Sequence, residues 1–142
     1  MTEQMSVKIA ALPSLRLTVE AHGLMAKKAL GQNFLLDQNI TDKIINLSLQ
    51  KQNKKDFSGA NVFEVGPGPG GLTRAVLAAE PKSLTVVEMD ERCIAIMNEI
   101  KEKTGDILHI INGDAMQTDF SGLAPAPRHI VSNLPYNISV PL

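Results

Sequence analysis

The sequence predicts an α/β fold in which parallel strands alternate with helices. Short apolar runs recur along residues 61–134, amphipathic stretches or long connections separate them, and the first run stops at a glycine-rich loop. Strands joined by such crossovers pair in parallel, and ligands bind at the carboxyl ends of the strands. A chain of 142 residues with 44% hydrophobic and 20% charged residues is typical of one soluble globular domain.

The first expected helix covers residues 37–50. Its apolar residues recur every three to four positions, at Leu36, Ile40, Ile44 and Leu47. The run NVFEV (61–65) then predicts a strand that stops at the glycine loop. LTRAVLAAE (72–80) predicts a helix that Pro81 closes, which gives the order strand, loop, helix.

A second unit of the same kind follows. SLTVVE (83–88) predicts a strand, and Asp90 is placed to cap a helix over residues 91–104 that ends before Gly105. Cys93 belongs to the apolar face of this helix, so we expect it to be buried. Two further strands are predicted at ILHII (107–111) and HIVSNL (129–134).

Composition excludes several classes of protein. No run approaches the roughly 20 apolar residues that span a bilayer, and the N-terminus lacks the features of a leader, so we expect a cytoplasmic protein without a membrane partner. A single cysteine excludes an internal disulfide, and without a second thiol or a suitably spaced histidine we expect no metal site.

Charge is distributed unevenly, although the net charge is −1. Residues 1–55 hold eight Lys and Arg against four Asp and Glu, whereas residues 56–142 hold six against eleven. The basic part could face a phosphate backbone. Alternatively, Lys51, Lys54 and Lys55 only solvate a helix end, and charge alone leaves both interpretations open.

The loop EVGPGPGG (64–71) and the acid after the next strand form a nucleotide-binding pattern. Gly66, Gly68 and Gly71 satisfy G-x-G-x-x-G, and Glu88 follows at the offset of an acid that binds a ribose diol. The alternative is a tight strand-to-helix turn without a ligand.

The prolines of this loop narrow the choice of cofactor. Pro67 and Pro69 remove two N–H donors that a dinucleotide would use to hold its pyrophosphate. A cofactor without phosphates is therefore favoured over a nicotinamide dinucleotide. S-adenosylmethionine fits, because its amino-acid end requires close approach to glycine backbone and its ribose requires an acceptor such as Glu88.

Two polar residues lie where the third and fourth strands end. Asp114, after the third strand, could accept a hydrogen bond from the exocyclic amine of the cofactor's adenine, although alone it is more typical of a turn. Asn133 falls at the carboxyl end of the fourth strand. Its side-chain oxygen and the Leu134 carbonyl could accept the N–H groups of an adenine amine, which aims the amine's lone pair at a methyl carbon.

The last motif residues suit an unstacked base. Tyr136 offers a face on which a base can stack, and Pro135 fixes the turn between it and Asn133. An isolated Asn-x-Pro-Tyr would equally be a structural turn with a tyrosine over the core edge. Its position after the glycine loop and the two acids favours the catalytic interpretation.

Taken together, these motifs resemble the ribosomal RNA adenine dimethyltransferase family. The resemblance covers residues 27–142 and is carried, in order, by KKALGQNFLLD (27–37), EVGPGPGGLT (64–73), VEMD (87–90), GDAM (113–116) and NLPYNIS (133–139). It implies a Rossmann-like class I methyltransferase with strand order 3-2-1-4. It also implies transfer of methyl groups from S-adenosylmethionine to N6 of two adjacent adenosines near the 3′ end of 16S rRNA, in the small ribosomal subunit or its precursor.

The resemblance assigns roles to residues of this sequence. It implies cofactor contacts for Asn33, Leu35, Gly66, Glu88, Asp114 and Asn133, and a catalytic motif made of Asn133, Leu134, Pro135 and Tyr136. Lys27 and Lys28 match a basic pair of the family, and whether they contact RNA stays open.

Length is where the sequence departs from the family. Such enzymes continue through the rest of the sheet and a small helical domain, so we expect residues 1–26 to be an extension and residues 27–142 a partial methyltransferase domain. The fourth strand would then be an exposed edge that favours association. Two alternatives remain: an enzyme that methylates large-subunit rRNA and gives antibiotic resistance, and a non-catalytic ribosome-assembly factor with this fold.

Overall fold

A computed structural model describes residues 4–23, 38–114, 128–132 and 140–141. Its helices are α1 (Met5–Ala10), α2 (Leu15–Ala21), α3 (Gln38–Lys51), α4 (Gly71–Ala78) and α5 (Glu91–Thr104). Its strands are β1 (Asn61–Val65), β2 (Ser83–Glu88), β3 (Leu108–Asn112), β4 (Arg128–Ser132) and β5 (Val140–Pro141). The first two strands have the predicted bounds, and the third is displaced by one residue.

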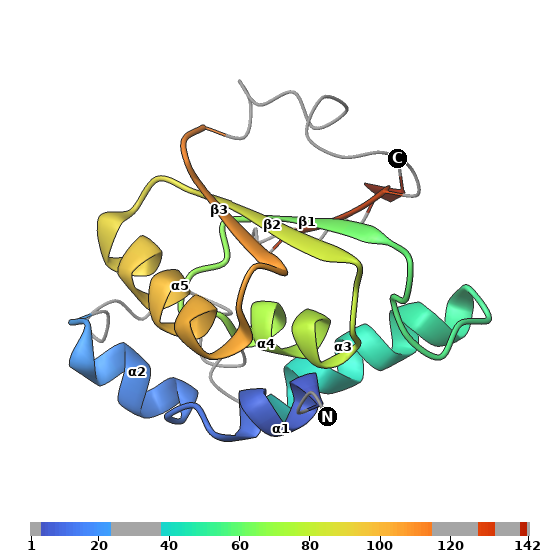
Figure 1. Ribbon diagram of the computed structural model, residues 1–142, viewed down its shortest axis with the longest axis horizontal. Coiled ribbons are helices and arrows are strands. Elements are labelled where there is room, and N and C mark those ends of the chain that lie inside the picture. The colour runs from blue at the N-terminus through green and yellow to red at the C-terminus, as the bar shows by residue number, and fades with distance from the viewer. Residues whose placement is uncertain (1–3, 24–37, 115–127, 133–139, 142) are drawn as a thin grey trace.

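These strands form one sheet in the order β3-β2-β1-β4-β5 (Figure 1). The order of the first four strands confirms the predicted order 3-2-1-4. These four strands are parallel, also as predicted. The prediction that β4 is an exposed edge is wrong in part. Two residues of β5 pair antiparallel with His129 and Ile130 of β4.

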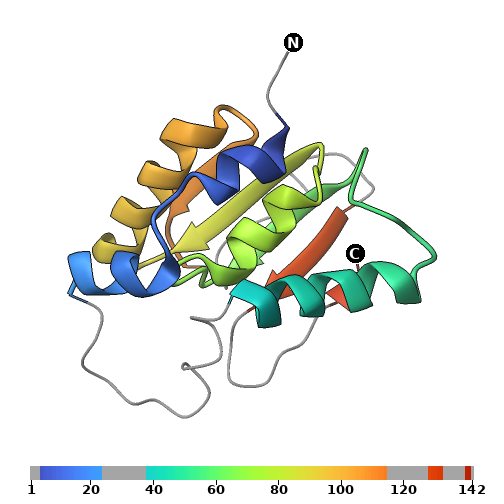
Figure 2. The same cartoon turned by 90° about the horizontal axis from the view of Figure 1, so that it is seen from below.

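All five described helices lie on one side of the sheet (Figures 1 and 2). Helices α3, α4 and α5 form the layer next to it, and α1 packs outside them against α4 and α5. Residues 71–77 of α4 are all buried, since this helix is covered by the sheet on one side and by α1 on the other. Among the described helices none has the length and apolar character needed to cross a bilayer.

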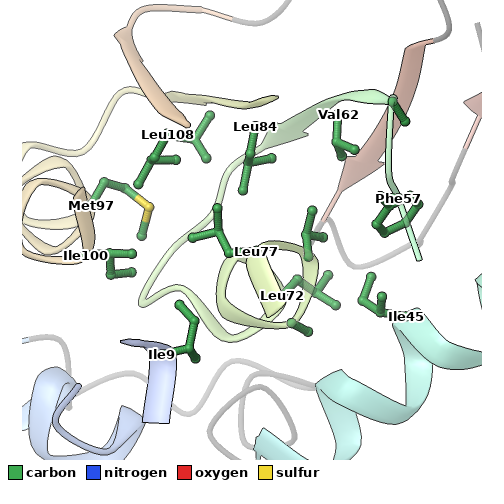
Figure 3. Packing of buried hydrophobic residues seen from close by; sticks show 14 of the residues in the cluster. Ile9, Ile45, Phe57, Val62, Leu72, Leu77, Leu84, Met97, Ile100 and Leu108 are labelled. Atoms are coloured by element: carbon green, nitrogen blue, oxygen red, sulfur yellow. The ribbon is translucent and has the colours of Figure 1, made fainter. Parts of the chain in front are cut away.

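The core lies between the sheet and the inner helices (Figure 3). Strand residues Val62, Leu84, Val86 and Leu108 meet side chains of α4 and α5, the most buried of which are Val76, Leu77, Ile96, Met97 and Ile100. Each is at most 1% exposed, and burying one such side chain stabilises the fold by about 1.5–3 kcal/mol. This packing fixes α4 and α5, which follow the carboxyl ends of β1 and β2.

The ends of α5 are as predicted. The Asp90 side chain accepts a hydrogen bond from the Arg92 amide, which makes it the N-cap, and Gly105 follows the last turn with a φ of 85°. Cys93 is buried, as expected. Burial is the main cause that raises the pKa of this thiol to about 12, so it is neutral at physiological pH.

The N-terminal arm, residues 5–23, packs on the outer side of the helical layer. Ile9 of α1 belongs to the core cluster. The buried Arg74 of α4 donates to the Pro13 carbonyl over 2.6 Å and to the Thr18 hydroxyl over 3.3 Å. The boundary predicted at residue 26 lies outside the described residues, but the arm itself is joined to the predicted methyltransferase domain.

Candidate active site

The carboxyl ends of the strands are aligned at one edge of the sheet. The Cα register pairs Val65 of β1 with Val87 and with Ser132, and pairs Glu88 of β2 with Asn112. The next residues continue these pairings: Gly66 N–H donates to the Val87 carbonyl and Gly113 N–H to the Glu88 carbonyl, each over 3.0 Å. The turns that follow β1, β2 and β3 therefore lie side by side.

The glycine loop adopts a backbone that other residues rarely adopt. Gly66, Gly68 and Gly70 have φ angles of 66°, 55° and 95°. A Cβ built on Gly66 or Gly68 would meet no atom within 4 Å, whereas one on Gly70 would lie 3.0 Å from the Ile100 side chain. The first two glycines thus leave open space beside the backbone, and the third permits tight packing of the loop on α5.

Glu88 connects this loop to the next turn. Its Oε1 accepts from the Gly68 N–H over 3.3 Å, and its Oε2 accepts from the N–H groups of Met89 and Asp90 over 2.9 and 3.1 Å. A carboxylate has about four acceptor positions. The half-buried Glu88 therefore has a further acceptor position for a hydroxyl group. The longest of its three hydrogen bonds is the one from Gly68, in the open part of the loop.

Glu64 was not singled out from the sequence, although it is the most buried acid near this edge. It lies in β1 with no exposed surface, and its Oε1 accepts from the Thr73 hydroxyl of α4 over 2.5 Å. Its other oxygen has no hydrogen-bond partner. Burial is the largest of the causes that raise the pKa of Glu64 to about 8, and the charge of Glu88 raises it further.

A carboxyl group with that pKa holds its proton at neutral pH. Protonation avoids a buried carboxylate without a counterion. The sequence did carry one signal, because Glu64 interrupts an apolar strand immediately before the glycine loop. An acid inside such a run is expected either to have a buried partner or to face a ligand.

Asp114 lies at the same edge as Glu88. It is half-buried and follows Asn112, the residue that pairs with Glu88 across the sheet, by two positions. The structure thus brings together Gly66, Glu88 and Asp114. In the described ranges no three His, Cys, Asp or Glu side chains gather in a way that could hold a metal ion.

Six predicted site residues lie outside the described residues: Asn33, Leu35, Asn133, Leu134, Pro135 and Tyr136. The described residues that come before or after them in the sequence lie at the carboxyl edge of the sheet. Strand β4 ends at Ser132, which pairs with Val65. The Arg92 side chain donates to the Gly23 carbonyl and the Gln38 side chain to the Gly71 carbonyl, each over 3.3 Å, so the chain on both sides of residues 24–37 is held there.

The lysines at the end of α3 are at the other end of the fold. After Lys51 the chain leads to the start of β1, and there the Phe57 amide donates to the carbonyl of Ala79, the residue after α4. This is the amino edge of the sheet, away from the glycine loop. The position favours the interpretation in which Lys51, Lys54 and Lys55 solvate a helix end.

Comparisons with known proteins agree with the sequence motifs. A family profile described as ribosomal RNA adenine dimethylase matches residues 23–142. Two curated relatives, from Gluconobacter oxydans (strain 621H) and Allorhizobium ampelinum (strain S4), are both named ribosomal RNA small subunit methyltransferase A. They are 49% and 51% identical to this chain over 132 residues.

The curated relatives are longer than this chain, and a solved structure shares its fold. The two matches cover 93% and 92% of this chain but 42% and 46% of the relatives, so the chain spans less than half of their length. A crystal structure of a candidate RNA methyltransferase from Pyrococcus horikoshii, 16% identical, matches with a TM-score of 0.53 over 84% of this chain and 53% of that one. This likeness concerns the fold alone, which is that of a Rossmann-like methyltransferase.

Proposed function

The chain belongs to the ribosomal RNA adenine dimethylase family, and from this premise we propose that the protein methylates adenosine in ribosomal RNA. The reaction transfers methyl groups from S-adenosylmethionine to N6 of two adjacent adenosines near the 3′ end of 16S rRNA. The substrate is the small ribosomal subunit or its precursor, in the cytoplasm. The names of both curated relatives favour this substrate over large-subunit RNA.

One observation carries the proposal: an open glycine turn and two acids meet at the carboxyl edge of a parallel sheet. The space beside Gly66 and Gly68 suits the amino-acid end of the cofactor, and Glu88 suits its ribose hydroxyls. Asp114, at the end of the neighbouring strand, suits the amine of its adenine. These residues fit S-adenosylmethionine, which when bound supplies an electrophilic methyl group on a sulfonium.

The chemical step is assigned to the motif after β4. We propose that the Asn133 side chain and the Leu134 carbonyl accept the N–H groups of the target amine, so that its lone pair is directed to the methyl carbon. Tyr136 stacks on the target base, which is worth about 1–3 kcal/mol in comparable complexes, and Pro135 sets the turn between the two. A strong base is not required, because the leaving group is a neutral thioether.

Binding of the cofactor can be tested apart from turnover. We expect S-adenosylmethionine to bind the chain in calorimetric titration, and Glu88→Gln to weaken it by roughly 10- to 100-fold, the range for a lost hydrogen bond to a charged group. Glu91→Gln is the matched control, since this exposed acid begins α5 and should leave affinity unchanged. Equal affinities for all three proteins would contradict the assigned ribose site.

Substrate choice requires a transfer assay. Labelled S-adenosylmethionine is supplied with small-subunit particles or with large-subunit RNA, and dimethyladenosine is measured by mass spectrometry. The Gluconobacter oxydans relative is assayed in parallel because it has the additional length. We expect transfer to small-subunit particles, and loss of transfer with Asn133→Ala. Preference for large-subunit RNA would support the alternative enzyme, and cofactor binding without transfer to either would support the non-catalytic alternative.

A further inference from the structure

Helix α3 has apolar side chains on two different sides. Its buried side, Thr41, Ile45 and Leu49, faces the inner layer, and the α3 and α4 helices are in contact. A second row, Ile40, Ile44 and Leu47, is 38%, 38% and 49% exposed. A spacing of four and then three residues places these three side chains on one side of a helix, and we call them the α3 ridge.

Such a row differs from the scattered apolar residues that any protein surface carries. Single exposed apolar residues are ordinary, and Val7, Leu17 and Met89 are of this kind: they lie on α1, on α2 and in the turn between β2 and α5. A helix that is apolar on two sides is typical of one covered on two sides. In the described structure only the side toward the core is covered.

The ridge lies on the same side of the molecule as the β4 and β5 end of the sheet. Helix α3 lies at the β1 and β4 side of the helical layer (Figures 1 and 2). Among the described residues, the outer side of β4 is paired at two positions, His129 and Ile130. The outer helix α1 packs against α4 and α5, so in the described structure the helical layer is less covered at α3 than at α5.

The greater length of the curated relatives indicates which polypeptide covers this row of side chains. The curated relatives that match nearly all of this chain have more than half of their own length outside the match. We propose that the α3 ridge is the docking surface for that additional polypeptide, which packs an apolar face against Ile40, Ile44 and Leu47. This inference does not depend on the methyl-transfer activity.

Co-expression tests the proposal. The chain is produced together with an affinity-tagged polypeptide that comprises the part of the Gluconobacter oxydans relative outside the match, and the amount of chain that co-purifies is measured. We expect wild-type chain to co-purify in a stoichiometric complex. Ile44→Lys places a charge in the middle of the ridge and should reduce recovery at least tenfold.

Leu17→Lys is the matched control, because it introduces the same charge at an exposed apolar residue of α2, away from the ridge. It should leave recovery unchanged. Thermal melts of both variants exclude loss of folding as the cause. The proposal is overturned if wild-type chain does not co-purify, or if Ile44→Lys co-purifies as well as wild type. It is also overturned if light scattering shows that the ridge instead joins two copies of this chain.

Discussion

Replacement of Glu64 by glutamine should change how the stability of the protein depends on pH. The pKa of Glu64 is about 8 in the folded chain, against 4.5 for a free glutamate side chain. Between these values the folded state holds a proton that the unfolded state has released. The stabilisation from Glu64 is therefore complete below about pH 4.5 and is lost as pH rises through 8.

The size of the effect follows from linkage. Each bound proton that differs between the two states changes the free energy of unfolding by on the order of 1 kcal/mol per pH unit. Wild-type protein should thus lose stability steadily from pH 5 to pH 8. Glutamine has nearly the same shape and its Oε1 can still accept from Thr73, but it cannot ionise, so this contribution to the slope should vanish in Glu64→Gln.

Urea unfolding at half-unit intervals from pH 5 to pH 8.5 measures the two curves, and their difference cancels the titration of groups that the proteins share. Asp56 and Asp90 have lowered pKa values, through hydrogen bonds to Ser58 and Arg92 respectively, so their contributions are lost only as pH falls through the acid range. Glu102→Gln, an exposed acid of α5, is the control for the change in net charge.

Parallel curves for wild type and Glu64→Gln would refute the reasoning, because they would mean that Glu64 does not hold a proton in the folded state. A Glu88→Gln variant gives a second check. Removing that negative charge should lower the pKa of Glu64, so the pH-dependent loss of stability should end at a lower pH than in wild type.

Three further predictions concern the elements around the site. Gly70→Ala should lower the free energy of unfolding by roughly 1–3 kcal/mol, and by more than Gly68→Ala, because both have positive φ but only Gly70 faces packed side chains; chemical denaturation compares the two. Deleting residues 1–14 removes the Pro13 carbonyl that accepts from buried Arg74 and should lower the free energy of unfolding by several kcal/mol. The same deletion should cost less in an Arg74→Met variant. If the two changes lower the free energy of unfolding additively, Arg74 and residues 1–14 are not coupled. Asp90→Ala should cost about 1 kcal/mol through loss of the α5 cap, whereas Asp90→Ser should restore most of it; thermal melts distinguish the two.

Much of the fold could be predicted because its signals are local. Strands β1 and β2 are apolar runs with a sharp change of composition at each end, so their bounds follow directly from the sequence. Asp90 and Gly105 mark the two ends of α5 in the same local way. The glycine loop and Glu88 could be placed at one edge of the sheet because parallel pairing aligns the ends of consecutive strands.

Other features depend on contacts that the sequence pattern does not reveal. The partner of Glu64 is nine residues away on the next helix, and neither residue is unusual for its element when considered alone. The N-terminal arm consists of helices of six and seven residues, which are too short to be stable alone and are held by packing and by Arg74. Strand β5 has only two residues, which are too few to show an alternation of apolar and polar side chains.

The position of Glu88 means that one carboxylate serves both the backbone and a ligand. Its two oxygens already join two backbone turns through the N–H groups of Gly68, Met89 and Asp90, and an acceptor position remains for a ligand. These backbone hydrogen bonds hold the carboxylate in place before a ligand arrives, so little side-chain freedom is lost when a hydroxyl group binds to it.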